Sequence, residues 1–153
     1  MAATSEQAEH SIQMLISDWL LIDGTMDNHV HSAIDGAVPV GWEEGPSWDT
    51  EAEMETTKLP TVAQLGTSIR QAGWDQILGW PHDAEGFRRW PAPGQMATMT
   101  LTNVQWDLVI FALNYWADVD VRLSDAEGAA RSRAIATVIG QLLAEQRWSP
   151  ESQ

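Results

Sequence analysis

The 153-residue sequence has no cysteine, so it can form neither a disulfide framework nor a thiolate metal site. It also lacks a basic, apolar leader at its N-terminus and any run of eighteen apolar residues, the features of a secretory signal and of a membrane-spanning helix. Hydrophobic residues make up 44% of the chain, enough for one core. We therefore expect a single domain, residues 1–153, located in the cytoplasm.

Basic residues are scarce. The chain has 8 Lys and Arg against 22 Asp and Glu, which gives a net charge of −14 and a pI near 4.3. Twelve of the acids precede Lys58, the first basic residue, and the other ten nearly balance all eight bases. Such a field disfavours direct binding to nucleic acid or to an anionic membrane, and favours a basic partner. A surface that serves only solubility is an equally weighted alternative.

Motifs for covalent chemistry are missing as well. The sequence has no Gly-x-Ser-x-Gly elbow and no glycine-rich phosphate loop. Carboxylates abound, but Glu51, Glu53 and Glu55 lie in a segment too hydrophilic to desolvate them, which a general acid at neutral pH requires. We therefore expect a non-enzymatic protein with no catalytic residue and no cofactor.

Two helices are the clearest elements that the sequence contains. Residues 102–147 predict a helical hairpin, 103–123 and 125–147, whose helices open with the capping boxes Thr102 with Gln105 and Ser124 with Glu127. The first helix is apolar nearly all round, so we expect it to be buried from several sides. The second has a single apolar stripe and should lie on the surface of the first.

The rest of the chain predicts a bundle of about four helices with long irregular connections, a mostly α fold. Gly66 lies on the buried face of the third predicted helix, where it permits close helix packing, and Gly73 should end that helix. Trp80 and Trp90 precede prolines and should cover the hairpin. The expected segments are a helix (5–22), an acidic irregular arm (24–59), a short helix (61–72) and a strap rich in Trp and Pro (73–101).

Asp27, His29 and His31 form an Asp-x-His-x-His pattern that resembles the metal-binding signature of amidohydrolases. In that family the two histidines hold a catalytic metal at the end of the first strand of a (β/α)₈ barrel. Such a barrel needs at least about 200 residues, more than this chain has. The resemblance implies, as an alternative function, a small metal-dependent hydrolase in which His82 completes the ligand set. An exposed polar loop is the favoured interpretation of the same residues.

The acidic arm is the predicted binding site for a partner. Its tryptophans are candidate anchors among carboxylates, and we expect residues 42–57 to order when a basic partner docks. The basic sequence Phe87-Arg88-Arg89-Trp90 is expected to clasp this arm through cation–π contacts. The predicted partner-binding residues are Asp35, Trp42, Glu43, Glu44, Trp48, Asp49, Glu51, Glu53 and Glu55.

In composition the chain resembles phage anti-restriction and anti-CRISPR proteins and acidic toxin-immunity proteins, which are small and strongly negative. Seven of the eight basic residues are arginine, which also suggests a bacterial or phage source. The resemblance implies an inhibitor that imitates DNA and occupies a basic, nucleic-acid-binding-like site on a partner protein. A second alternative is a structural subunit of a homo-oligomer or virion, in which helix 103–123 buries its surplus apolar face against a symmetry mate.

Overall fold

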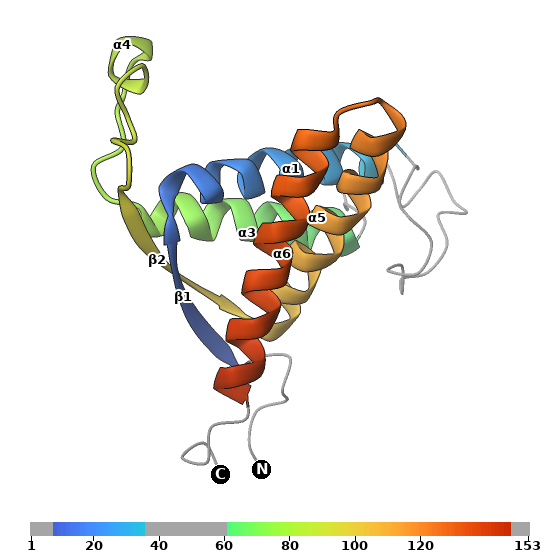
Figure 1. Cartoon of the computed structure of the whole chain (residues 1–153). Helices are drawn as coiled ribbons and strands as arrows, with labels where there is room; N and C mark the ends of the chain where they lie inside the picture. The colour runs from blue at the N-terminus through green and yellow to red at the C-terminus, as the bar shows by residue number, and fades with distance from the viewer. Residues whose placement is uncertain (1–7, 36–60, 148–153) are drawn as a thin grey trace, which may run out of the picture.

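A computed structural model describes residues 8–35 and 61–147, and 70% of these residues are helical. The fold is mostly α with a small two-stranded sheet, which confirms the predicted fold class (Figure 1). Among the described helices, none has the length and apolar character needed to cross a membrane. The elements in chain order are β1 (Glu9–Leu15), α1 (Ile16–Ile34), α3 (Thr61–Gln76), α4 (Ala84–Phe87), β2 (Met96–Thr102), α5 (Asn103–Arg122) and α6 (Ala126–Arg147).

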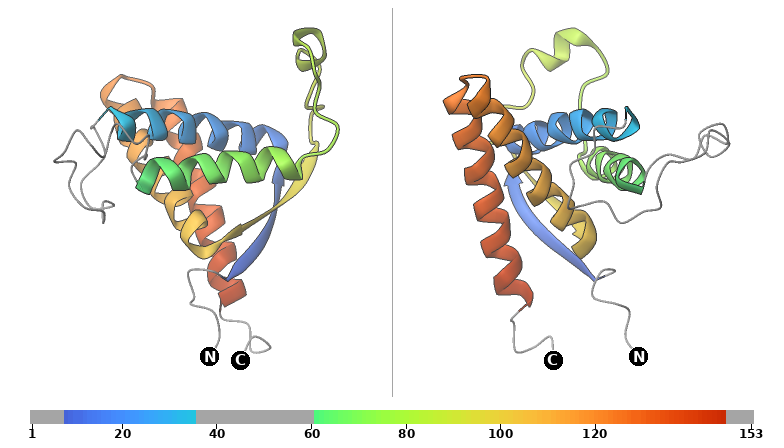
Figure 2. Two further views of the ribbon diagram at one scale, coloured as in Figure 1. Left: turned by 180° about the vertical axis from the view of Figure 1, so that it is seen from behind. Right: turned by 90° about the vertical axis from the view of Figure 1, so that its right-hand side faces the viewer.

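The helices form two antiparallel pairs. Helices α1 and α3 lie side by side, and the α5–α6 hairpin crosses this pair (Figures 1 and 2). The β1–β2 ribbon is antiparallel, with Glu9 opposite Thr102 at one end and Leu15 opposite Met96 at the other. Because α1 follows β1 directly and α5 follows β2 directly, the ribbon joins one helix pair to the other.

The predicted helix over residues 5–22 is wrong between Glu9 and Leu15, which form strand β1. Ile12 and Met14 are buried and their neighbours in the strand are more exposed, the alternation of a strand with one face on the core. Met99 of β2 pairs with Ile12 and is also buried. The ribbon depends on this distant partner, whereas the local sequence spacing also fits a helix.

Helix α1 continues past Gly24 to Ile34, so the predicted helix end is wrong, as is the irregular structure predicted for residues 24–34. A Cβ atom at Gly24 would meet nothing within 4 Å, so this glycine sits on an open helix face and fulfils no packing need. The remainder of the predicted acidic arm, residues 36–59, lies outside the described residues.

Helix α3 also runs further than predicted, to Gln76, because Gly73 does not end it. A Cβ at Gly73 would lie only 1.9 Å from Cζ2 of Trp19, so this glycine lets the α1 tryptophan pack directly on the α3 backbone. At Gly66 a Cβ would lie 2.6 Å from Val30 of α1, which confirms the predicted close approach. The predicted strap is therefore shorter than 73–101: its first residues belong to α3 and its last to β2.

The C-terminal hairpin is confirmed, with α5 and α6 close to their predicted bounds. The capping box of Thr102 with Gln105 is also confirmed. The box of Ser124 with Glu127 is wrong, because the Asp125 carboxylate accepts the backbone N–H of Gly128 at 3.0 Å. Ser124 instead adopts a left-handed conformation, with φ of 66°, and turns the chain between the helices.

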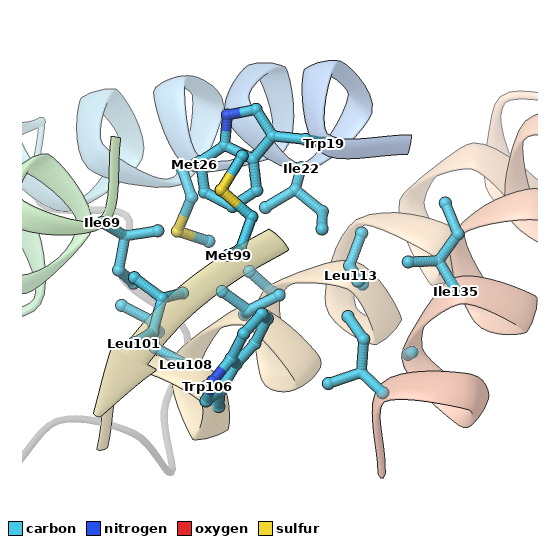
Figure 3. Close-up of a cluster of buried hydrophobic side chains, with 14 of the residues drawn as sticks. Trp19, Ile22, Met26, Ile69, Met99, Leu101, Trp106, Leu108, Leu113 and Ile135 are labelled. Atoms are coloured by element: carbon cyan, nitrogen blue, oxygen red, sulfur yellow. The ribbon is translucent and has the colours of Figure 1, made fainter. Parts of the chain in front are cut away.

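The core lies where the two helix pairs and the ribbon meet (Figure 3). Trp19 of α1 and Trp106 of α5 are completely buried. The Trp106 ring N–H donates to the His10 carbonyl at 3.0 Å, so it also ties α5 to β1. The core side chains labelled in Figure 3 come from α1, α3, β2, α5 and α6: Trp19, Ile22, Met26, Ile69, Met99, Leu101, Trp106, Leu108, Leu113 and Ile135.

Candidate functional site

Of the predicted partner-binding residues, the structure describes only Asp35. Its backbone N–H donates to the His31 carbonyl at 3.0 Å, and its side chain is exposed directly after α1. The C-terminal end of α1 and the N-terminal end of α3 lie at the same end of the molecule (Figures 1 and 2). The chain therefore leaves and re-enters the described fold there. The remaining predicted residues lie outside the described residues: Trp42, Glu43, Glu44, Trp48, Asp49, Glu51, Glu53 and Glu55.

A second acidic feature, which the sequence analysis missed, is the turn between α5 and α6. It lies toward the same end of the molecule as the C-terminal end of α1 (Figure 1). The carboxylates of Asp120 and Asp125 lie near each other, since both approach the same glycine. A Cβ atom at Gly128 would lie 2.5 Å from an oxygen of Asp125 and 3.2 Å from an oxygen of Asp120. Leu123 stands exposed beside them, at 72%. We call this group the acidic turn; its charged side chains are Asp120, Arg122, Asp125 and Glu127.

Most arginines of the described residues are engaged within the molecule. Five of the seven form ion pairs with acids, among them Arg131 with Asp18 at 3.3 Å and Arg147 with Asp107 at 3.4 Å. Such surface pairs add little stability, but each neutralises a cation. The arginines paired in this way are Arg70, Arg89, Arg131, Arg133 and Arg147. The excess carboxylates are thus left facing solvent with few free counter-charges near them.

A hydrogen-bonded charge cluster joins α1 to α3. Arg70 donates from Nε to Asp23 at 2.9 Å and from Nη1 to Asp27 at 2.7 Å. The ring N–H of Trp74 donates to Asp23 at 3.2 Å, and Asp23 is only 9% exposed. The hydrogen bond to Asp23, with further contributions from Asp27, raises the pKa of Arg70. With its oxygens occupied by these donors, Asp23 holds the helix pair together and is not available to an outside ligand.

Asp27, His29 and His31 are not brought together. On a helix, residues four apart share a face, so Asp27 and His31 meet on the exposed side, with 3.4 Å between Oδ1 and Nδ1. His29 points the other way and is buried, while His82 is exposed on the strap. Among the residues that the structure describes, no three His, Asp or Glu side chains are placed to hold a metal ion.

The His29 side chain of α1 packs among three aromatic side chains of α5. Its ring makes edge contacts with Phe111 at 6.0 Å, Tyr115 at 6.1 Å and Trp116 at 6.5 Å between centroids. The Trp116 ring N–H donates to His29 Nδ1 at 3.1 Å, which makes Nδ1 an acceptor and places the proton of the neutral ring on Nε2. Nε2 is buried and has no hydrogen-bond partner among the residues that the structure describes. Burial lowers the pKa of His29 from 6.5 to about 4, so the ring is neutral at physiological pH.

The strap tryptophans gather on α3. The Trp74 ring lies 5.1 Å from that of Trp80 and 6.4 Å from that of Trp90, and Phe87 meets the edge of Trp90. Trp80 and Trp90 are half-buried against the core, and their described ring contacts are with these residues and His82. The predicted clasp of residues 87–90 on the acidic arm involves residues outside the described ones. The strap leaves α3 at its C-terminal end, whereas the described chain resumes after residue 60 at the opposite, N-terminal end of that helix (Figure 1).

Helix α5, the predicted oligomer surface, is covered within the single chain. Its residues Trp106, Leu108, Val109 and Leu113 are fully buried against the other elements. Its apolar surface is thus satisfied mainly inside the fold, as predicted for a helix buried from several sides. Association through residues 103–123 stays a prediction.

The structure shows a mostly α-helical protein in which Asp35 and the acidic turn lie toward one end, while other exposed carboxylates, among them Glu9, Asp75 and Glu145, lie elsewhere on the surface. No family model, no curated protein and no solved structure matches the chain. Any function must therefore be argued from its own residues.

Proposed function

We propose that this is a non-enzymatic acidic interaction protein, an inhibitor of the phage anti-defence or toxin-immunity type. In this proposal its negative surface occupies a basic, nucleic-acid-binding-like site on a partner protein and so imitates DNA. The observation that carries the proposal is the charge balance: the chain has a net charge of −14, and five of its seven described arginines are already paired with acids inside the molecule.

The arrangement of the acids supports one binding end. Asp35, the acidic turn and both attachment points of the acidic segment lie toward the same end of the molecule (Figure 1). Exposed apolar side chains stand among them: Ile34 is 42% exposed, Val121 50% and Leu123 72%. A specific acidic interface needs two parts: carboxylates that steer the encounter, and apolar anchors that hold the complex together.

Capture from a lysate of the source organism, with the tagged full-length chain as bait, tests this proposal. Mass spectrometry identifies the captured protein, and duplex DNA is then added as a competitor. We expect a protein with a basic nucleic-acid site, displaced by DNA because both ligands use that site. A captured protein that DNA leaves in place would contradict DNA mimicry.

Two variants with equal net charge test whether the position of the carboxylates matters or only their number. In the segment variant four acids of the predicted acidic arm are neutralised: Glu43→Gln, Glu44→Gln, Glu51→Gln and Glu53→Gln. In the control variant four exposed acids elsewhere are neutralised: Glu9→Gln, Asp75→Asn, Glu85→Gln and Glu145→Gln. We expect the segment variant to lose at least about tenfold in affinity for the captured protein, and the control to lose much less. Equal losses in both variants would mean that the net charge acts without a defined site.

A further inference from the structure

Exposed apolar side chains concentrate at the end of the fold that carries Asp35 and the acidic turn. The structure describes seven large apolar side chains that are exposed, and three of them belong to this end: Ile34, the last residue of α1, and Val121 and Leu123 at the turn between α5 and α6. The C-terminal end of α1 lies close to that turn in both figures (Figures 1 and 2). A single exposed leucine is ordinary, but apolar side chains grouped among charges are typical of an interaction site.

Backbone hydrogen bonds fix the conformation of the acidic turn. The Leu123 N–H donates to the Val119 carbonyl at 3.0 Å, and the Asp125 N–H donates to the Asp120 carbonyl at 2.8 Å. Ser124 between them has a φ of 66°, and the Asp125 carboxylate caps the first turn of α6. Because this backbone is fixed before a partner arrives, the docking of its side chains costs little conformational entropy.

The surroundings of Leu123 are negatively charged. Asp120, Asp125 and Glu127 form no ion pair within the part of the chain that the structure describes, and Arg122 is the single base of the turn. Three acids and one base give the acidic turn a net charge of −2. An exposed leucine in such a setting is complementary to an apolar pocket that basic residues surround.

We propose that Leu123 is the apolar anchor of the acidic binding surface and enters an apolar pocket beside the basic residues of the partner's site. This inference rests on the proposed function and adds the chemistry of the partner: a basic, nucleic-acid-binding-like surface with an apolar pocket at its edge. The carboxylates of the acidic turn attract the partner over a distance, and the buried leucine slows dissociation. Duplex DNA fills the basic part of the site and leaves the pocket empty, so the pocket distinguishes this protein from DNA.

Binding kinetics with the captured protein separate the anchor from the charges. In the full-length chain, Leu123→Ala should raise the dissociation rate about tenfold and change the association rate less than about twofold. The double variant Asp120→Asn with Glu127→Gln should instead lower the association rate at low salt. Leu78→Ala is the matched control and should bind as the wild type, because Leu78 is 84% exposed but lies on the strap.

A second variant guards against a small effect of truncation. Leu123→Lys places a cation against the basic rim of the pocket, so it should weaken binding more than Leu123→Ala does. Position 123 is 72% exposed, so both variants should unfold at the wild-type temperature, which thermal unfolding checks.

A photo-reactive side chain at position 123 tests the pocket directly. Benzoylphenylalanine replaces Leu123 in one sample of the full-length protein and Leu78 in the control. Illumination of the complex should join position 123 to a partner peptide in which Lys or Arg lies beside apolar residues, and the control should give no adduct. An adduct from position 123 to an acidic peptide, or no adduct at all, would overturn the proposal.

The outcomes distinguish this inference from the proposed function. If DNA displaces the captured protein but both Leu123 variants dissociate like the wild type, the proposed function stands and Leu123 is not its anchor. If no protein with a basic site is captured, or if DNA leaves that protein in place, the proposed function fails and the anchor fails with it. Equal effects of Leu78→Ala and Leu123→Ala on the dissociation rate would also overturn the assignment of the anchor.

Discussion

Protonation of one buried side chain, His29, should contribute to the destabilisation of this protein by acid. In the unfolded chain its pKa is the ordinary 6.5, and in the folded protein burial lowers it to about 4. Well above pH 6.5 the ring is neutral in both states, so it does not change the free energy of unfolding. As the pH falls from 6.5 toward 4, the unfolded chain takes up a proton that the folded chain does not, so the free energy of unfolding falls.

The size of this loss follows from the shift. A difference of one pKa unit corresponds to about 1.4 kcal/mol, so the interval between 6.5 and about 4 gives a loss of about 3 kcal/mol between pH 7 and pH 4. The structure gives the reason: a proton on Nδ1 would face the donating N–H of Trp116, and the charged ring would be surrounded by Phe111 and Tyr115.

Urea unfolding followed by tryptophan fluorescence at several pH values measures this effect. Carboxylates also titrate in this range, so the informative quantity is the difference between the wild type and His29→Gln. Glutamine can still accept the Trp116 N–H but does not titrate, so the variant should lose about 3 kcal/mol less than the wild type between pH 7 and pH 4. His31→Gln, at an exposed position on the same helix, is the control for the loss of a histidine outside the buried site. Equal pH dependence in wild type and His29→Gln would refute this reasoning.

Two further predictions concern packing and capping, and both are read from the same unfolding curves at pH 7. Gly73→Ala should lower the free energy of unfolding by at least about 1–3 kcal/mol, because its Cβ would overlap the Trp19 ring, whereas Gly24→Ala should raise it by roughly 0.5–1 kcal/mol on an open helix face; equal effects at the two glycines would contradict the packing described. Asp125→Ala should cost about 1 kcal/mol through loss of the α6 cap, and Ser124→Gly should stabilise the turn by about 1 kcal/mol because glycine adopts positive φ freely; a neutral Asp125→Ala would reassign the cap.

The C-terminal hairpin was predictable because its signals are local. The capping box of Thr102 with Gln105 and the apolar patterns of both helices lie within single turns of chain. Strand β1 was not predictable in the same way, because Ile12 and Ile16 also fit a helix and only pairing with Met99 selects the strand. Gly73 was misread for a related reason: glycine ends helices, but it also admits a close neighbour, and Trp19 comes from another element.

The same distinction between local signals and contacts of distant residues applies to the candidate sites. Once α1 is known to be helical, the spacing of Asp27, His29 and His31 already separates His29 from the other two. The sequence alone favours a loop for all three residues. The pairing of Asp23 with Arg70 joins residues far apart in the chain and leaves no local signal. The charge excess was visible in the composition, whereas the placement of Asp35 and the acidic turn toward the same end follows from the tertiary arrangement (Figure 1).

The association rate with the captured partner, measured against salt concentration, tests the proposed function most directly. If unbalanced carboxylates steer the encounter, the rate should fall steeply as salt rises, because the Debye length shrinks from about 10 Å at 0.1 M to about 3 Å at 1 M. The segment variant should show a shallower salt dependence than the control variant of equal net charge. A rate indifferent to salt, or the same slope for both variants, would contradict an acidic binding site.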